Sequence, residues 1–229
     1  WTLTTNTRLT EVEARVLGAL VEKEITTPEY YPLSLNALVN ACNQKSNREP
    51  VMNLSEEEVT QAMRRLSDME LAGAANTSDS RVRKYEHRLQ EAFNFTRPEI
   101  AVLCVLLLRG EQTPGELRGR AERMFHFDDL SDVQAALQKL MSREPALARV
   151  LARRPGTKES RYVQLLSGDE SGGGDAEVAR DAEQDRALER ISAASELERI
   201  TRLENEVAKL REEVAELREQ LAQFRKQFE

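Results

Sequence analysis

The stretch Leu9–Pro28, LTEVEARVLGALVEKEITTP, aligns without a gap on Phe95–Pro114, FTRPEIAVLCVLLLRGEQTP, when the sequence is shifted by 86 residues. The positions identical in the two copies are, in the first copy, Thr10, Glu13, Val16, Leu17, Leu20, Thr27 and Pro28. A threonine followed three residues later by a glutamate predicts a capping box at a helix start. The apolar matches share one helical face and predict its burial. The chain therefore contains an internal repeat that begins with a buried helix.

A second pair of matching segments predicts a later helix in each copy. VTQAMRRL at residues 59–66 aligns on VQAALQKL at residues 133–140 with a shift of 74, and both have apolar residues at positions 1, 4, 5 and 8. Thr113, Pro114 and Glu116 supply a cap, a first-turn proline and a capping glutamate for an intervening helix. A strand-like pair around a polar turn then follows, at residues 71–87 and 148–166.

Three helices followed by a two-stranded ribbon form a winged helix. The sequence therefore predicts a mainly α fold with small β-ribbons (α+β), with tandem winged-helix domains at residues 1–95 and 96–167. The first copy holds 12 more residues than the second between its first and third helices, and we assign most of them to the polar loop 43–54. Long ordered loops tend to be functional, and a disordered insertion is the alternative.

Three segments carry a resemblance to a known family. NACNQKSNREPVM at residues 40–52, LSEEEVTQAMRRL at 54–66 and RVRKYEHRL at 81–89 resemble the YceH-like family of bacterial proteins of unknown function. The resemblance covers about residues 3–166 and implies a tandem winged-helix fold in a cytoplasmic bacterial protein, but no activity. The loop motif of the family, which would contact DNA or a protein, comprises Asn43, Gln44, Lys45, Ser46, Asn47 and Arg48.

The C-terminal quarter predicts a self-association helix. Residues 168–176 read as a flexible linker, and residues 177–229 as a helix with coiled-coil heptads from 200 to 228. The heptad core, with branched residues at a and leucine at d, favours a parallel homodimer; its members are Ile200, Leu203, Val207, Leu210, Val214, Leu217, Leu221, Phe224 and Phe228. Glu206 would face Arg211 of the second chain in that arrangement. The alternative is one amphipathic helix folded back onto the winged domains.

Charge and composition limit the function classes. The net charge is −7, yet residues 97–168 carry 12 basic and 9 acidic side chains, so nucleic-acid affinity is expected there. The sequence has no phosphate loop, metal-ligand spacing or nucleophile motif, so we expect no enzyme and no cofactor. Cys42 and Cys104 are expected to be buried thiols. The apolar run 100–108 is too short to cross a bilayer, so we expect no membrane partner; free thiols suit a reducing cytoplasm, where we expect the protein to be located.

DNA binding is the usual role of a winged helix, in which the third helix enters the major groove and the ribbon contacts the backbone. The candidate nucleic-acid contacts are the polar residues of the third helices and the basic residues of the ribbons: Thr60, Gln61, Arg64, Arg65, Arg81, Arg83, Lys84, Gln134, Gln138, Lys139, Arg143, Arg149, Arg153, Arg154, Lys158 and Arg161.

Three glutamates, at positions 56–58, oppose DNA contact by the first copy because they would face phosphates. The competing hypothesis is therefore a protein-interaction scaffold, since tandem winged helices also serve as assembly platforms in chromosome-organisation complexes; that comparison is an analogy of fold. No sequence feature points to a ligand held between the two domains.

Overall fold

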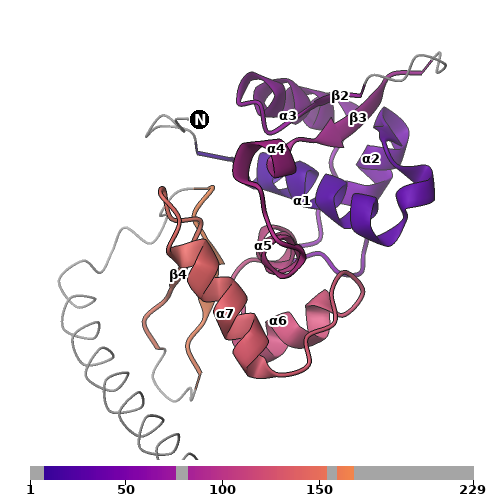
Figure 1. Ribbon diagram of the computed structural model, residues 1–229. Coiled ribbons are helices and arrows are strands. Elements are labelled where there is room, and N and C mark those ends of the chain that lie inside the picture. The colour runs from indigo at the N-terminus through magenta and orange to yellow at the C-terminus, as the bar shows by residue number, and fades with distance from the viewer. Residues whose placement is uncertain (1–7, 76–81, 154–158, 168–229) are drawn as a thin grey trace, which may run out of the picture. The chain divides into compact units, whose positions relative to one another are not determined.

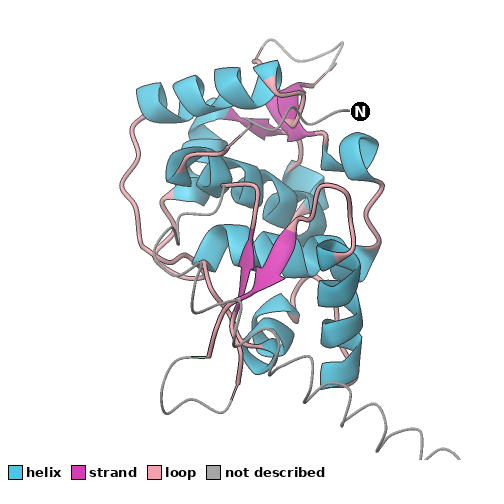
Figure 2. Cartoon of the chain, turned by 90° about the vertical axis from the view of Figure 1, so that its left-hand side faces the viewer, coloured by secondary structure: helices cyan, strands magenta, loops and turns pink. Residues whose placement is uncertain are grey.

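The computed structural model describes residues 8–75, 82–153 and 159–167 (Figure 1). All of them belong to one unit, which ends at Gly172. The described part is mainly helical and carries two small antiparallel sheets (Figure 2). The expected linker, the heptad residues from 200 to 228, and the candidate contacts Arg81, Arg154 and Lys158 lie outside the described residues.

The first half of this unit runs from α1 to α4. Its elements are α1 (Glu11–Thr26), the short 3₁₀ helix η1 (Pro28–Tyr30), β1 (Leu33–Ser34), α2 (Leu35–Cys42), α3 (Glu56–Asp68), β2 (Ala72–Ala74), β3 (Lys84–His87) and α4 (Leu89–Phe93). The three strands form an antiparallel sheet in the order β1-β3-β2, in which Leu33 and Ala74 flank Tyr85.

The second half repeats the same order of helices and strands. Its elements are α5 (Arg97–Arg109), α6 (Pro114–Ala121), α7 (Leu130–Met141), β4 (Ala148–Val150) and β5 (Tyr162–Gln164). The strands β4 and β5 pair with Arg149 opposite Val163. A single bridge between Gln112 and Tyr162 takes the position that β1 occupies in the first half.

Side-chain caps determine where the helices begin. Glu13 and Thr10 close a capping box at the start of α1, since Thr10 N–H donates to Glu13 Oε2 at 2.9 Å and Glu13 N–H donates to Thr10 Oγ1 at 3.3 Å. Thr113 and Glu116 close the same box at α6, where Pro114 fills the first turn. The predicted starts of these helices are confirmed.

The expected position of the insertion is wrong in part. Equivalent residues differ by 86 at the first helices, by 79 at the caps Ser34 and Thr113 of the second helices, and by 74 at the third helices. Seven of the 12 extra residues therefore precede α2, and five lie in the loop after it. The reason is Pro32, which would fall inside a helix started at Pro28, so α2 begins later.

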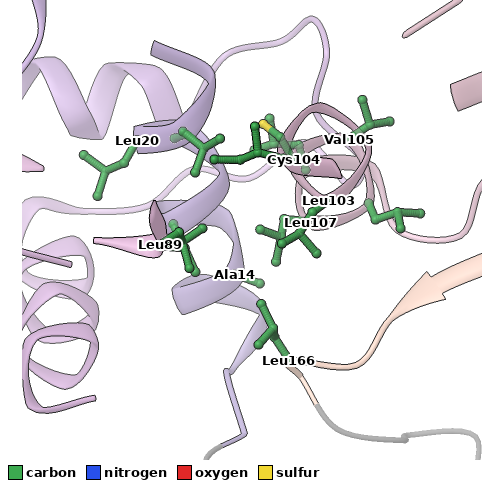
Figure 3. Close-up of a cluster of buried hydrophobic side chains, with 14 of the residues drawn as sticks. Ala14, Leu20, Leu89, Leu103, Cys104, Val105, Leu107 and Leu166 are labelled. Carbon is green, nitrogen blue, oxygen red and sulfur yellow. The ribbon is translucent and has the colours of Figure 1, made fainter. Parts of the chain in front are cut away.

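The helices α1 and α5 pack against each other and join the two halves into one core. Both are buried around most of their circumference, from Glu13 to Glu22 and from Glu99 to Leu108. Figure 3 shows side chains from α1, α5 and the segment after β5 meeting in this core. The Cys104 thiol donates to the Gly18 carbonyl of α1 across a distance of 3.4 Å.

The two cysteines are buried free thiols, as the sequence predicts. Burial raises the pKa of the Cys42 thiol to about 12, and it raises the pKa of Cys104 as well. No helix in the described ranges has the length and hydrophobicity that a bilayer-spanning segment needs.

Candidate nucleic-acid interface

The helix α7 separates a buried face from an exposed polar face. Its apolar stripe is buried in the core: Val133, Ala136, Leu137 and Leu140. On the opposite side Gln134, Gln138 and Lys139 are exposed to solvent. Amide and ammonium groups can donate to base edges and to phosphates, so this face is able to contact a nucleic acid.

The corresponding face of α3 is acidic. Glu56, Glu57 and Glu58 occupy its first turn and are exposed, whereas the first turn of α7 has the single acid Asp132, preceded by the exposed Asp128 and the N-cap Asp129. Glu58 Oε2 accepts hydrogen bonds from the Ser55 N–H at 2.7 Å and the Ser55 hydroxyl at 2.8 Å. These bonds lower the pKa of Glu58 and keep it ionised. The α3 face would therefore repel phosphates more than the α7 face.

The remaining candidates on α3 differ in exposure. Gln61 and Arg64 are exposed, while Thr60 is half-buried and donates its hydroxyl to the Glu56 carbonyl at 2.7 Å. This hydrogen bond to the backbone already uses the Thr60 hydroxyl as a donor within the helix.

The β-hairpins carry the next group of candidates. Arg83, immediately before β3, is exposed, and Lys84, the first residue of β3, is half-buried. Arg153, beyond β4, is exposed and donates from Nε to the Ser160 hydroxyl at 3.2 Å. Arg161 is half-buried and donates to the Glu111 carbonyl at 2.9 Å and to Glu116 Oε2 at 3.1 Å. Arg153 is therefore better placed than Arg161 for a phosphate.

Two further candidates neutralise buried carboxylates at equivalent positions of the two halves. Arg65 Nε lies 3.0 Å from Glu13 Oε1, and Arg143 Nη2 lies 3.0 Å from Glu99 Oε1. The side chains of both glutamates are at most 4% exposed. The Arg143 guanidinium also stacks 4.6 Å from the Phe95 ring centre. Arg143 follows the end of α7 and packs inward, whereas the helical pattern placed it on the exposed face.

The segment 43–55 joins α2 to α3 and contains the predicted polar loop 43–54. This loop 43–55 turns most of its family-motif residues inward. The Asn43 side chain pairs twice with the backbone of Leu54: its Nδ2 donates to the Leu54 carbonyl at 2.8 Å, and its Oδ1 accepts from the Leu54 N–H at 2.7 Å. Arg48 is buried and donates to both carboxylate oxygens of Glu22 and to the Ala41 carbonyl. Gln44 Oε1 accepts a bond from Arg48 at 3.1 Å, and Lys45 and Ser46 are exposed.

The same loop also bonds to the second half. Arg109, at the end of α5, donates to Asn47 Oδ1 at 2.5 Å, and the Glu49 N–H donates to the Leu108 carbonyl at 2.9 Å. Asn47 has a φ of 59°, a left-handed conformation that asparagine tolerates better than most residues. The loop motif therefore holds α1, α2 and α5 together.

Sequence reasoning assigned the glutamates of the capping boxes to helix starts and missed that arginines pair with three buried acids: Glu13, Glu22 and Glu99. The available signal was a glutamate at a position where the helical pattern is otherwise apolar, since buried charges are almost always paired.

The histidines each bond to a carboxylate. His87 Nε2 lies 2.7 Å from Glu24 Oε2, and the Leu89 N–H donates to His87 Nδ1 at 3.3 Å. Exposed His126 lies 2.7 Å from Glu122 Oε1, which raises the pKa of His126. Among the described side chains, no three His, Cys, Asp or Glu residues come together in a metal-binding arrangement.

The described unit thus consists of two successive helical halves with small sheets. Comparisons with known proteins identify its family. A family model described as a protein of unknown function, DUF480, matches residues 9–157. A UPF0502 protein of Koribacter versatilis is 63% identical over 153 residues, which cover 67% of this chain and 71% of that protein.

Relatives from other bacteria match more of the chain. A UPF0502 protein of Geotalea daltonii is 52% identical over 198 residues, covering 86% of this chain and 88% of its own length. A UPF0502 protein of Vibrio atlanticus is 46% identical over 208 residues, covering 89% and 92%. The chain therefore belongs to the DUF480 (UPF0502) family of unknown function, and the resemblance to the YceH-like family is confirmed.

Proposed function

We propose that this chain is a non-enzymatic, cytoplasmic DNA-binding protein in which each half of the described unit is a winged helix. The order of three helices and an antiparallel hairpin supports this reading of both halves. The second half would contact DNA, with α7 in the major groove and the β4–β5 hairpin along the backbone.

One observation carries the choice of the second half. Gln134, Gln138 and Lys139 are exposed on α7, which packs against β4, and Arg153 is exposed beyond that strand. The corresponding surface of α3 begins with three exposed glutamates instead. Because phosphate contacts supply most of the sequence-independent affinity, DNA should favour the helix with fewer acids in its first turn and an adjoining arginine.

Dimerisation would compensate for the small number of cations on one α7 surface. A single unit with few phosphate contacts is expected to bind DNA weakly, with a dissociation constant of about 10⁻⁴ to 10⁻⁶ M at physiological salt. Two linked units bind the same duplex with a higher effective affinity. The heptads from 200 to 228 would supply that linkage as a parallel coiled coil.

A pair of matched double variants tests the assignment. Lys139→Glu with Arg153→Glu reverses two exposed charges in the second half, and Arg64→Glu with Arg83→Glu makes the same change of charge in the first half. Fluorescence anisotropy with a labelled mixed-sequence duplex measures both. We expect the first pair to lose affinity by at least about tenfold and the second pair to lose much less. Equal losses would contradict docking through the second half.

The alternative function is a protein-interaction scaffold, and the acidic surface of α3 favours it. Leu35, Glu56, Glu57 and Arg64 line an open groove beside α3, where a basic partner would find carboxylates next to an apolar contact. Two results together would support this alternative. The chain would bind no DNA, and the variant Glu56→Lys with Glu57→Lys would no longer associate with a basic protein partner.

A further inference from the structure

A pocket of about 390 Å³ lies between the two halves. The first half contributes the start of α1 and the end of the loop 43–55, and the second contributes the end of α5 with β4 and β5. A hydrogen bond of 2.8 Å from the Leu9 N–H to the Leu166 carbonyl ties the two halves together beside it. Its volume is in the range of small-molecule sites.

One part of the wall is apolar and comes from both halves. Its side chains are Leu9, Ala14, Met52, Leu106, Leu107 and Val163. Such a wall favours an apolar group on a ligand, because the group would leave water on binding.

Arg15 supplies a buried donor to the wall of the pocket. The residue is 2% exposed, and its Nη1 and Nη2 donate to the carbonyls of Cys42 and Pro50 at 3.2 and 2.6 Å. Its Nε–H has no acceptor among the described residues. Buried donors are nearly always satisfied, so an acceptor oxygen at this point would be favourable.

The charged groups around the pocket are of both signs. Arg149 on β4 adds a second guanidinium to the wall, while three glutamates also line it: Glu11, Glu49 and Glu111. A simple anion would be attracted by the arginines and repelled by the glutamates, and a simple cation would meet the reverse. A ligand carrying both charges, with its carboxylate toward the arginines and its ammonium toward the glutamates, satisfies both sets.

We propose that this pocket binds a small zwitterion with an apolar side chain, of the chemical class of the apolar α-amino acids. The carboxylate lies toward Arg15 and Arg149, the ammonium toward Glu11 and Glu49, and the side chain lies on the apolar wall. Because both halves line the pocket, the bound ligand stabilises their mutual arrangement and raises the unfolding temperature by mass action.

Isothermal titration calorimetry of the full chain tests the proposal with L-alanine, L-leucine and L-phenylalanine as probes. We expect at least one of them to bind saturably. Two analogues of leucine separate the charges: 4-methylpentanoate lacks the ammonium, and 3-methylbutylamine lacks the carboxylate. Each should bind at least about tenfold more weakly than leucine, since each lacks one of the two charges that the wall would attract.

A matched pair of variants on one hairpin locates the binding. Arg149→Gln should weaken the amino acid by about tenfold or more, whereas Arg153→Gln, at a residue that does not line the pocket, should leave the affinity unchanged. Circular dichroism melting of both variants checks that they are folded. The proposal is overturned if no probe binds at about 10 mM, if an analogue with one charge binds as well as the amino acid, or if folded Arg149→Gln binds like the unaltered chain. No DNA is present in these measurements, so their outcome is independent of the proposed function.

Discussion

Arg48 places its guanidinium against the carboxylate of Glu22, with Nη2 2.6 Å from Oε2 and Nη1 3.2 Å from Oε1. The Arg48 side chain is fully buried and that of Glu22 is 7% exposed. The arginine comes from the loop 43–55 and the glutamate from the middle of α1. The polar loop 43–55 thus neutralises a charge inside the core.

Removing Arg48 should destabilise the fold because Glu22 would remain buried without a partner. We expect Arg48→Met to lower the free energy of unfolding by about 3–5 kcal/mol, as for other broken buried ion pairs. Urea denaturation measures the loss. Lys45→Met, in the same loop but exposed, is the matched control and should change stability by less than about 0.5 kcal/mol.

The double variant Arg48→Met with Glu22→Met distinguishes two causes of lost stability: an unpaired buried charge and the loss of the other contacts of the loop. It should regain part of the stability lost by Arg48→Met, since neither residue then leaves an unpaired charge. A single Arg48→Met variant as stable as the unaltered chain would show that the pair does not hold the loop.

The Glu99 carboxylate predicts a pH-dependent contribution to stability. Burial by itself raises the pKa of Glu99, but hydrogen bonds from Thr96 and the Arg143 guanidinium outweigh burial and lower it. The ionised form therefore stabilises the fold at pH values above the unfolded-state pKa of about 4.3, and this contribution is lost as the pH falls through the lower folded-state pKa.

The variant Glu99→Gln tests this pH dependence because glutamine can also serve in a capping box. We expect a loss of about 1–3 kcal/mol at neutral pH, and a smaller difference from the unaltered chain in acid below the folded-state pKa. Exposed Glu91→Gln is the control. Denaturation curves at several pH values give the comparison, and a difference that is constant with pH would contradict it.

Close packing of α1 on α5 requires a glycine at position 18. A Cβ atom built on Gly18 would lie 2.9 Å from Leu108 side-chain atoms and 3.1 Å from the Leu107 Cβ. Gly18→Ala should therefore cost about 1–3 kcal/mol through overpacking.

A glycine with open space around it provides the control for Gly18. A Cβ on Gly119, in α6, would meet nothing within 4 Å. Gly119→Ala should thus leave stability unchanged or raise it by up to about 1 kcal/mol, because alanine favours a helix. Thermal melts compare the two variants, and an equal effect of both would contradict the close contact between the helices.

The helices could be predicted from sequence because their determinants are local. Thr10 with Glu13 and Thr113 with Glu116 are capping boxes within four residues, and the apolar stripes repeat at helical spacing. The position of the insertion was harder to predict, since Thr27 and Pro28 match the start of α6. Pro32 then prevents a helix from continuing, an effect that the alignment of the two copies does not contain.

The buried charges could not be assigned from sequence because their partners are distant in the chain. Arg48 and Glu22 are separated by 26 residues, and Arg143 and Glu99 by 44. A polar loop motif such as Asn43–Arg48 is typical of a surface contact, yet a fold with buried acids also needs arginines to neutralise them. The pocket beside Arg15 likewise depends on how the two halves pack, which no local pattern encodes.

The most direct test of the central claim is a titration of a labelled mixed-sequence duplex with the full chain at rising salt. The account predicts binding at about 50 mM salt that weakens steeply by about 200 mM. It also predicts that Lys139→Glu with Arg153→Glu reduces the slope of log affinity against log salt by roughly 2 per subunit. No binding at about 50 mM salt, where phosphate contacts are strongest, would contradict DNA binding by this chain.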